Sequence, residues 1–153
     1  MHGFGRRFLM PSRRFLNTIF ILMSEMQLPQ DLRSFILMSV GSVPYLEAML
    51  LLRREPELPW DAHRLARRLY VAEKKSEELL QALLQARIVV ATESSETAFC
   101  YRPASPELAA MVDRLAAFYA SNLVDVTHLI HATHERKAEK FANAFIWRKK
   151  PNA

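Results

Sequence analysis

Apolar residues recur every three or four positions along most of this chain, which is the spacing of one face of a helix. Asp31 is placed to cap a first helix, and Gly41 interrupts that helix. Ser42 then caps a second helix with Pro44 in its first turn, a favourable way for a helix to begin. The second helix is apolar nearly all round and stops before Pro56, so we expect it at the centre of the core.

The stretch from Pro59 to Pro103 carries the most informative pattern in the chain. Trp60 and Asp61 are expected to open a short third helix, with Asp61 as its N-cap. A tight turn at 70–72 leads to an amphipathic fourth helix over 73–87. The expected buried residues of these two helices are all apolar: Leu65, Ala66, Leu69, Leu79, Leu80, Leu83 and Leu84.

Two β-prone segments follow, at 88–90 and 98–101. They flank a polar loop over 92–97 that lacks the Asn-Gly signal of a two-residue turn. We therefore expect a two-stranded hairpin with a longer loop. Cys100 lies in the second apolar segment, where a buried structural thiol is expected.

Beyond the hairpin, Ser105 and Pro106 begin a long amphipathic helix that is expected to continue to residue 134. Such a helix is longer than a small core needs to cover, so we predict a homodimer that forms through 105–134. The alternative is that the helix folds back across its own domain. A last segment over 135–150 places Phe141 and Phe145 on one face, and we expect them to cover the core while the basic residues face water. The alternative is that this aromatic and basic segment docks onto another protein, a nucleic-acid backbone or an anionic membrane.

The run Leu-Ala-Arg-Arg-Leu at 65–69, the turn after it, and Leu79, Leu80 and Leu83 resemble the helix-turn-helix of bacterial MarR-like winged-helix proteins. The resemblance covers residues 42–103 and, less specifically, the long helix after them. It implies a mainly α fold with a small β-wing, that is, a winged helix-turn-helix with a long C-terminal helix. It also implies transcription regulation by a dimer whose second helix enters the major groove.

Three positions depart from the family pattern. Tyr70 stands where the turn glycine is usual, so the backbone there is expected to differ. Ala72 replaces the usual Ser or Thr cap and offers no side-chain oxygen to the helix start. Arg87 replaces the glycine that ends the helix.

Composition limits the possible classes of protein. With 153 residues, of which 50% are hydrophobic, the chain is long enough for one domain with tails, and three glycines argue against an all-β fold. The single Cys100 excludes an internal disulfide and a cysteine-cluster metal site, and it fits a reducing, cytoplasmic location.

The net charge of +5 is distributed unevenly along the chain. Residues 1–30 carry four arginines and one acid, and residues 136–153 carry six Lys/Arg and one acid, so the basic character lies in the two tails. The body between them is acidic, whereas a nucleic-acid-binding domain usually has its positive charge on the folded surface.

These patterns divide the chain into four parts. Residues 1–30 are interpreted as a disordered or mis-assigned N-terminal extension, with an amphipathic surface-binding segment or an export signal as alternatives. Its apolar run over 15–23 is too short for a transmembrane helix, which needs about 20 residues. The winged-helix domain is expected over 31–104, the dimerisation helix over 105–134, and a basic helix and tail over 135–153.

The resemblance implies a protein that binds double-stranded DNA, and the residues placed to contact DNA are those with charged or amide side chains on the third and fourth helices. They are Arg64, Arg67, Arg68, Lys74, Lys75, Glu78 and Gln81.

The other charges of this stretch favour a different class of protein. Lys74 and Glu78 could equally form an i,i+4 pair, and the hairpin loop carries Glu93 and Glu96 but no Lys or Arg. The alternative function is therefore a winged-helix protein–protein interaction module that does not read DNA.

The sequence contains no nucleophile–base–acid constellation and no glycine-rich phosphate loop, so we predict neither an enzyme nor a cofactor. His128, His131 and His134 recur at a spacing of three and could bind a metal together with Asp125 or Glu135. The interpretation we adopt is that they face solvent near a helix C-terminus, with no metal bound.

Overall fold

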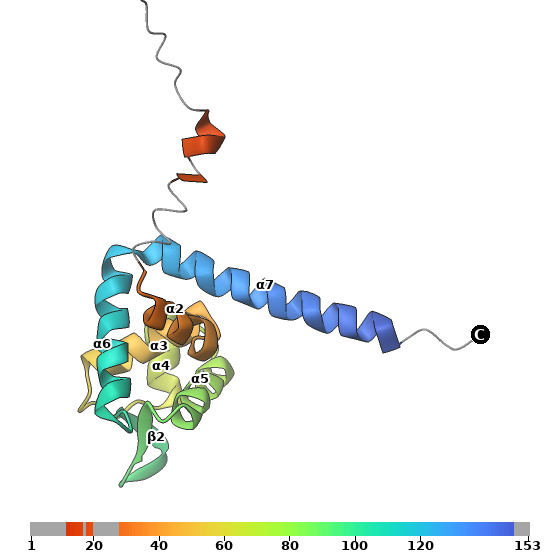
Figure 1. Cartoon of the computed structure of the whole chain (residues 1–153). Helices are drawn as coiled ribbons and strands as arrows, with labels where there is room; N and C mark the ends of the chain where they lie inside the picture. Colours follow the sequence, from red (N-terminus) through yellow and green to blue (C-terminus); the bar gives the residue numbers. More distant parts are fainter. Residues whose placement is uncertain (1–11, 17, 20–27, 149–153) are drawn as a thin grey trace, which may run out of the picture. The chain divides into compact units, whose positions relative to one another are not determined.

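The structure is a computed structural model that describes residues 12–16, 18–19 and 28–148, and of 145–148 it describes only their place in a helix. The chain divides into two units, residues 1–30 and 31–153, which are considered separately (Figure 1). In the first unit, residues 13–16 and 18–19 are helical, and the Thr18 hydroxyl donates to the carbonyl of Arg14. The predictions of disorder and of a mis-assigned start concern residues that are mostly outside the described part of the chain.

The first two predicted helices of the body are present as α2 (Gln30–Ser39) and α3 (Val43–Arg54). The Ser42 hydroxyl caps α3 by accepting from the Tyr45 amide at 3.2 Å, as predicted. The buried face of α3 includes Leu46, Met49 and Leu52, none of which is exposed to solvent, which confirms α3 as a core helix.

The prediction that Asp31 caps α2 from outside is wrong, because the helix already begins at Gln30. Asp31 lies in the first turn, and both of its carboxylate oxygens accept from the Arg114 guanidinium, one of them at 2.9 Å. This pair lowers the pKa of Asp31 to about 2, and the hydrogen bond from Arg114 is the main cause.

The next two helices, α4 (Ala62–Leu69) and α5 (Glu73–Gln85), pack against each other, and both pack on α3. Each is followed by a residue with a positive φ, Tyr70 at 56° directly after α4 and Arg87 at 58° two residues after α5. The amide of Val71 then donates back to Ala66, and the amide of Ile88 donates back to Leu83, which is the six-to-one bond of a Schellman ending.

The expectation that the backbone at Tyr70 departs from a glycine-like turn is therefore wrong. Tyr70 takes the left-handed conformation that glycine usually supplies, and it does so with its side chain 95% exposed. The expectation for Ala72 is confirmed, because α5 begins with no side-chain hydrogen bond to its first amides.

The hairpin consists of β1 (Val89–Thr92) and β2 (Ser95–Tyr101), paired antiparallel. The turn is only two residues long, Glu93 and Ser94, so the prediction of a longer loop is wrong. The pairing register of the two strands shifts between Ala91 and Thr92, so residues 95–97 of the predicted loop lie within β2 instead. Strand pairing thus extends further toward the tip than the apolar pattern indicates.

A third segment of chain joins this hairpin through Trp60. The prediction that Trp60 opens the third helix is wrong. Its amide donates to the Phe99 carbonyl at 2.8 Å and its carbonyl accepts from the Phe99 amide at 2.9 Å, as in an antiparallel pair. The Trp60 side chain is completely buried. Cys100, next to Phe99, is half-buried, and its thiol faces the Leu58 carbonyl.

The predicted helix over 105–134 is broken into α6 (Pro106–Ser121) and α7 (Leu123–Arg148). The Ser105 cap is confirmed, since its hydroxyl accepts from the Leu108 amide. The helix breaks at Asn122, whose side-chain amide donates to the Phe118 carbonyl at 3.0 Å and so competes with the helical ladder. The break was missed because the apolar spacing continues across it.

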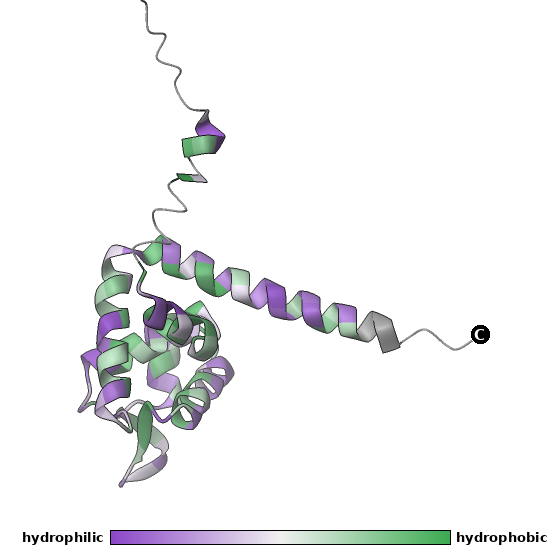
Figure 2. Ribbon diagram, in the orientation of Figure 1, coloured by the Kyte–Doolittle hydropathy of each residue, from purple (hydrophilic) through white to green (hydrophobic). Residues whose placement is uncertain are grey.

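Both sides of the break bury apolar residues against the domain. Val112 and Leu115 of α6 and Val126 of α7 are at most 1% exposed, so much of 105–134 folds back across its own domain. The fold is thus mainly helical, with a small two-stranded antiparallel sheet and a long C-terminal helix, an architecture compatible with a winged helix. Figure 2 shows hydrophobic colour along the inner faces of α3 and α6 and mixed colour along α7.

In the described part of the chain, no single helix is long and apolar enough to cross a bilayer. The helices α2 and α3 meet those criteria only as a pair, and they are bent by 110° relative to each other.

Candidate functional site

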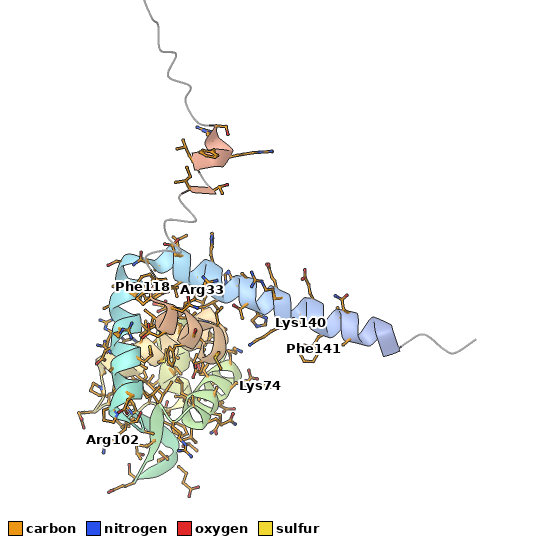
Figure 3. All side chains as sticks on the ribbon, in the orientation of Figure 1. Arg33, Lys74, Arg102, Phe118, Lys140 and Phe141 are labelled. Carbon is orange, nitrogen blue, oxygen red and sulfur yellow. The ribbon has the colours of Figure 1, made fainter. Side chains whose placement is uncertain are left out.

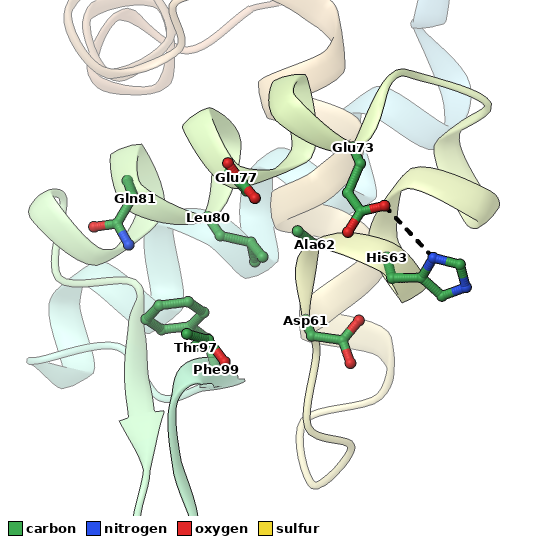
Figure 4. A pocket seen from close by; sticks show the side chains of 9 residues that line it. All are labelled: Asp61, Ala62, His63, Glu73, Glu77, Leu80, Gln81, Thr97 and Phe99. Carbon is green, nitrogen blue, oxygen red and sulfur yellow. Dashed lines mark ion pairs between the residues drawn. The ribbon is translucent and has the colours of Figure 1, made fainter.

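A groove of about 460 Å³ lies where the start of α4, the outer side of α5 and strand β2 meet (Figure 4). Leu80 and Phe99 line it but are almost completely buried, at 1% and 2% exposed, and Ala62 adds a small apolar side chain. The polar residues that line the groove come from all three elements: Asp61, His63, Glu73, Glu77, Gln81 and Thr97.

Local structure explains why carboxylates gather here. Asp61 is the N-cap of α4, and its Oδ1 accepts from the Arg64 amide at 2.7 Å. Glu73 occupies the first turn of α5, where the helix dipole favours a negative charge. Glu77 follows one turn later on the same side of the helix. The two helix starts thus bring three carboxylates to one groove.

The groove is negative overall. His63 Nδ1 lies 3.6 Å from Glu73 Oε2 and is the one ion-pair partner that the described residues offer to these carboxylates. The lining described for this groove contains no Lys or Arg. The groove therefore suits a ligand that combines positive charge with an apolar group, and it disfavours phosphate.

Two of the arginines predicted to contact DNA are engaged within the protein. Arg64 donates to the Pro59 carbonyl at 2.6 Å. Arg68 lies 3.6 Å from a Glu55 carboxylate oxygen and 5.9 Å from the centre of the Trp60 ring, a cation–π arrangement. Each of these contacts directs a guanidinium toward the domain itself rather than toward a partner.

The predicted i,i+4 pair of Lys74 with Glu78 is not formed. The structure instead pairs Lys75 with Glu78 at 3.4 Å, one residue closer along α5. Lys74 and Arg67 are exposed and have no ion-pair partner among the residues described here, and Lys74 is marked on α5 in Figure 3. Of the seven predicted residues, only Gln81 lines the groove.

A second cavity, of about 450 Å³, lies between α3, α4 and α6. Arg53, Arg54 and Arg68 line it, and the Tyr119 hydroxyl donates to Glu47 at its edge. Burial, followed by the Glu47 carboxylate, raises the pKa of Tyr119 to about 12. Its lining was not recognisable from the sequence, because it requires α6 to lie beside α3.

The three histidines of α7, His128, His131 and His134, are all exposed. No group of three metal-ligating side chains comes together within the described residues. Comparison of the chain with protein-family models, with curated proteins and with solved structures finds no match.

Proposed function

We propose that this chain is a winged-helix interaction module that binds a basic protein segment in the groove between α4, α5 and β2. The observation that carries the proposal is the lining of that groove, with three carboxylates around apolar residues and no Lys or Arg among those described. The absence of a nucleophile–base constellation in the sequence is consistent with a binding role.

The winged-helix assignment is part of this proposal. Two helices joined by a tight turn precede a hairpin, and Trp60 pairs with the hairpin as a one-residue third strand would. In a DNA-reading winged helix the second of those helices and the wing face the duplex together. Here the corresponding surface is the acidic groove.

Electrostatics decides between a basic partner and a phosphate backbone. A carboxylate and a phosphate about 7 Å apart repel by about 0.6 kcal/mol even with the dielectric constant of water, and a lysine at that distance is attracted by the same amount. Three carboxylates multiply this preference, and a less solvated groove increases it. The electrostatic energy at this groove therefore favours binding of a basic segment and opposes binding of DNA.

The second candidate function is double-stranded DNA binding by a transcription regulator. The specific observation in its favour is that Arg67 and Lys74 are exposed on α4 and α5 without an ion-pair partner among the described residues. Gln81, one of the residues predicted to contact DNA, is also exposed. An amide at such a position can recognise adenine if the helix enters a major groove.

Fluorescence anisotropy at about 50 mM salt separates the two candidates. The probes are a random duplex, a lysine- and phenylalanine-containing helical peptide, and the same peptide with glutamate in place of lysine. We expect binding of the basic peptide alone. That binding should weaken at least about tenfold in a Glu73→Gln/Glu77→Gln variant. It should stay unchanged in the control Glu93→Gln, which removes one carboxylate at the hairpin tip, outside the groove lining.

Tight duplex binding that weakens steeply with salt and is lost in Arg67→Ala/Lys74→Ala would overturn the interaction-module proposal and support the DNA reading. Failure of the basic peptide to bind at all would also count against the module.

A further inference from the structure

Among the residues that the structure describes, nothing covers positions 134–144 of α7. Every residue from His134 to Ala144 is exposed, and the Phe141 side chain is 74% exposed. Figure 3 shows Lys140 and Phe141 on α7 beyond the side chains of the domain. The prediction that Phe141 covers the core is therefore wrong, and the corresponding prediction for Phe145 concerns a side chain outside the described ones.

These exposed residues combine one large apolar side chain with charged ones, among them the acids Glu135 and Glu139. Lys137 lies four residues before Phe141, on the same face of the helix, and Lys140 is its immediate neighbour. Arg136 adds a further positive charge, and Arg148 follows in sequence at the helix end. A single exposed phenylalanine is common on protein surfaces, so it is its combination with Lys137 and Lys140 on one stretch of helix that makes this a candidate contact surface.

The groove between α4, α5 and β2 offers the complementary chemistry. Its lining combines the carboxylates of Glu73 and Glu77 with Leu80 and Phe99, of which 1% and 2% remain exposed. A volume of about 460 Å³ is enough for a phenyl ring together with the hydrocarbon stem of a lysine. Phe141 would fill the apolar part while Lys137 and Lys140 meet the carboxylates.

We propose that the groove of one copy of this protein binds the second half of α7, residues 134–148, from a second copy. This partner assignment rests on the function proposed above. The contact is between molecules, because residues 134–144 of α7 are exposed in the chain by itself and so do not occupy their own groove. It also differs from the dimer predicted through 105–134, since several apolar residues of that segment are buried within the domain.

Two different surfaces meet in this contact, so its symmetry has a definite consequence. A closed dimer forms only if the α7 helix of each copy binds the groove of the other. If only one of the two helices binds, one groove and one helix remain free to bind further copies. Either assembly is detected as a mass above that of the monomer.

Sedimentation velocity of the full chain over a range of concentrations tests the inference. We expect self-association that weakens at least about tenfold in Lys137→Glu/Lys140→Glu and likewise in Glu73→Lys/Glu77→Lys. Mixing these two variants should restore association, because the reversed charges again complement each other. All four positions are exposed, and circular dichroism of each variant checks that it is folded.

A Glu93→Lys variant reverses one carboxylate at the hairpin tip, outside the described groove lining, and should leave the association unchanged. Phe141→Ala should weaken association without changing the net charge, which separates apolar docking from charge alone.

Three outcomes would overturn the inference. A monomer that still binds the basic peptide leaves the interaction module standing and assigns the groove to a different protein. A monomer that binds no basic peptide removes both proposals together. An oligomer that is insensitive to all of the charge reversals places the contact elsewhere on the chain.

Discussion

Replacing Tyr70 with glycine should stabilise the folded domain, although the substitution removes an aromatic side chain. Tyr70 ends α4 with φ 56° and ψ 41°, in the left-handed region where a Cβ atom crowds the following carbonyl. Because its side chain is 95% exposed, almost no burial is lost when it is removed.

The expected gain follows from two opposing terms. A left-handed residue other than glycine costs about 1–2 kcal/mol, and glycine removes this cost. Glycine also loses more conformational freedom on folding, which lowers the free energy of unfolding by about 0.5–1 kcal/mol. The free energy of unfolding should thus rise by about 0.5–1 kcal/mol, and the midpoint of thermal unfolding by about 2–4 °C for a domain of this size.

Urea denaturation followed by circular dichroism measures the effect. The midpoint should rise with no change in the m-value, since the surface exposed on unfolding is the same. Tyr70→Ala is the matched control, because alanine keeps the Cβ atom and therefore the strain while it removes the same aromatic ring. If alanine and glycine stabilise equally, or if glycine destabilises, the reasoning from backbone strain is refuted.

Three further predictions concern contacts described above. Trp60→Leu should lower the free energy of unfolding by about 2–4 kcal/mol, because it leaves a cavity in a completely buried site, and chemical denaturation measures this loss. Ser105→Ala should cost about 1 kcal/mol through the lost cap of α6, measured in the same way, and a change below about 0.3 kcal/mol would contradict the assigned cap. Arg114→Gln should raise the carboxyl pKa of Asp31 from about 2 toward 3.8, and NMR titration measures this change. A carboxyl pKa that is lower in the folded than in the unfolded protein stabilises the fold only above the unfolded pKa. The stabilisation of the fold by this pair is therefore present above about pH 4 and is lost as the pH falls toward 2.

Local signals predicted much of the fold. The caps at Ser42, Asp61 and Ser105 each follow from a short polar side chain just before an apolar-periodic run, and each forms its bond in the structure. The core role of α3 followed from its uniform hydrophobicity. These features depend on neighbours within four residues, so the sequence pattern contains them.

The features that were missed depend on contacts between distant segments. Nothing near Trp60 indicates that its backbone pairs with Phe99, because strand partners are not adjacent in sequence. The break at Asn122 was hidden because the apolar spacing continues through it. At the candidate site, the sequence identified the charges on α4 and α5 but not their partners. Gln81 was the one predicted residue that lines the groove.

The backbone bridge between Trp60 and Phe99 has a consequence for how a partner would bind. Trp60 directly precedes Asp61 on one wall of the groove, and Phe99 lies two residues after Thr97 on another. Two hydrogen bonds therefore hold the walls at a fixed separation before any partner arrives. The groove is preorganised, so the entropy lost on association falls mainly on the incoming segment. A partner held rigid as a helix should bind more tightly than a flexible peptide of the same composition.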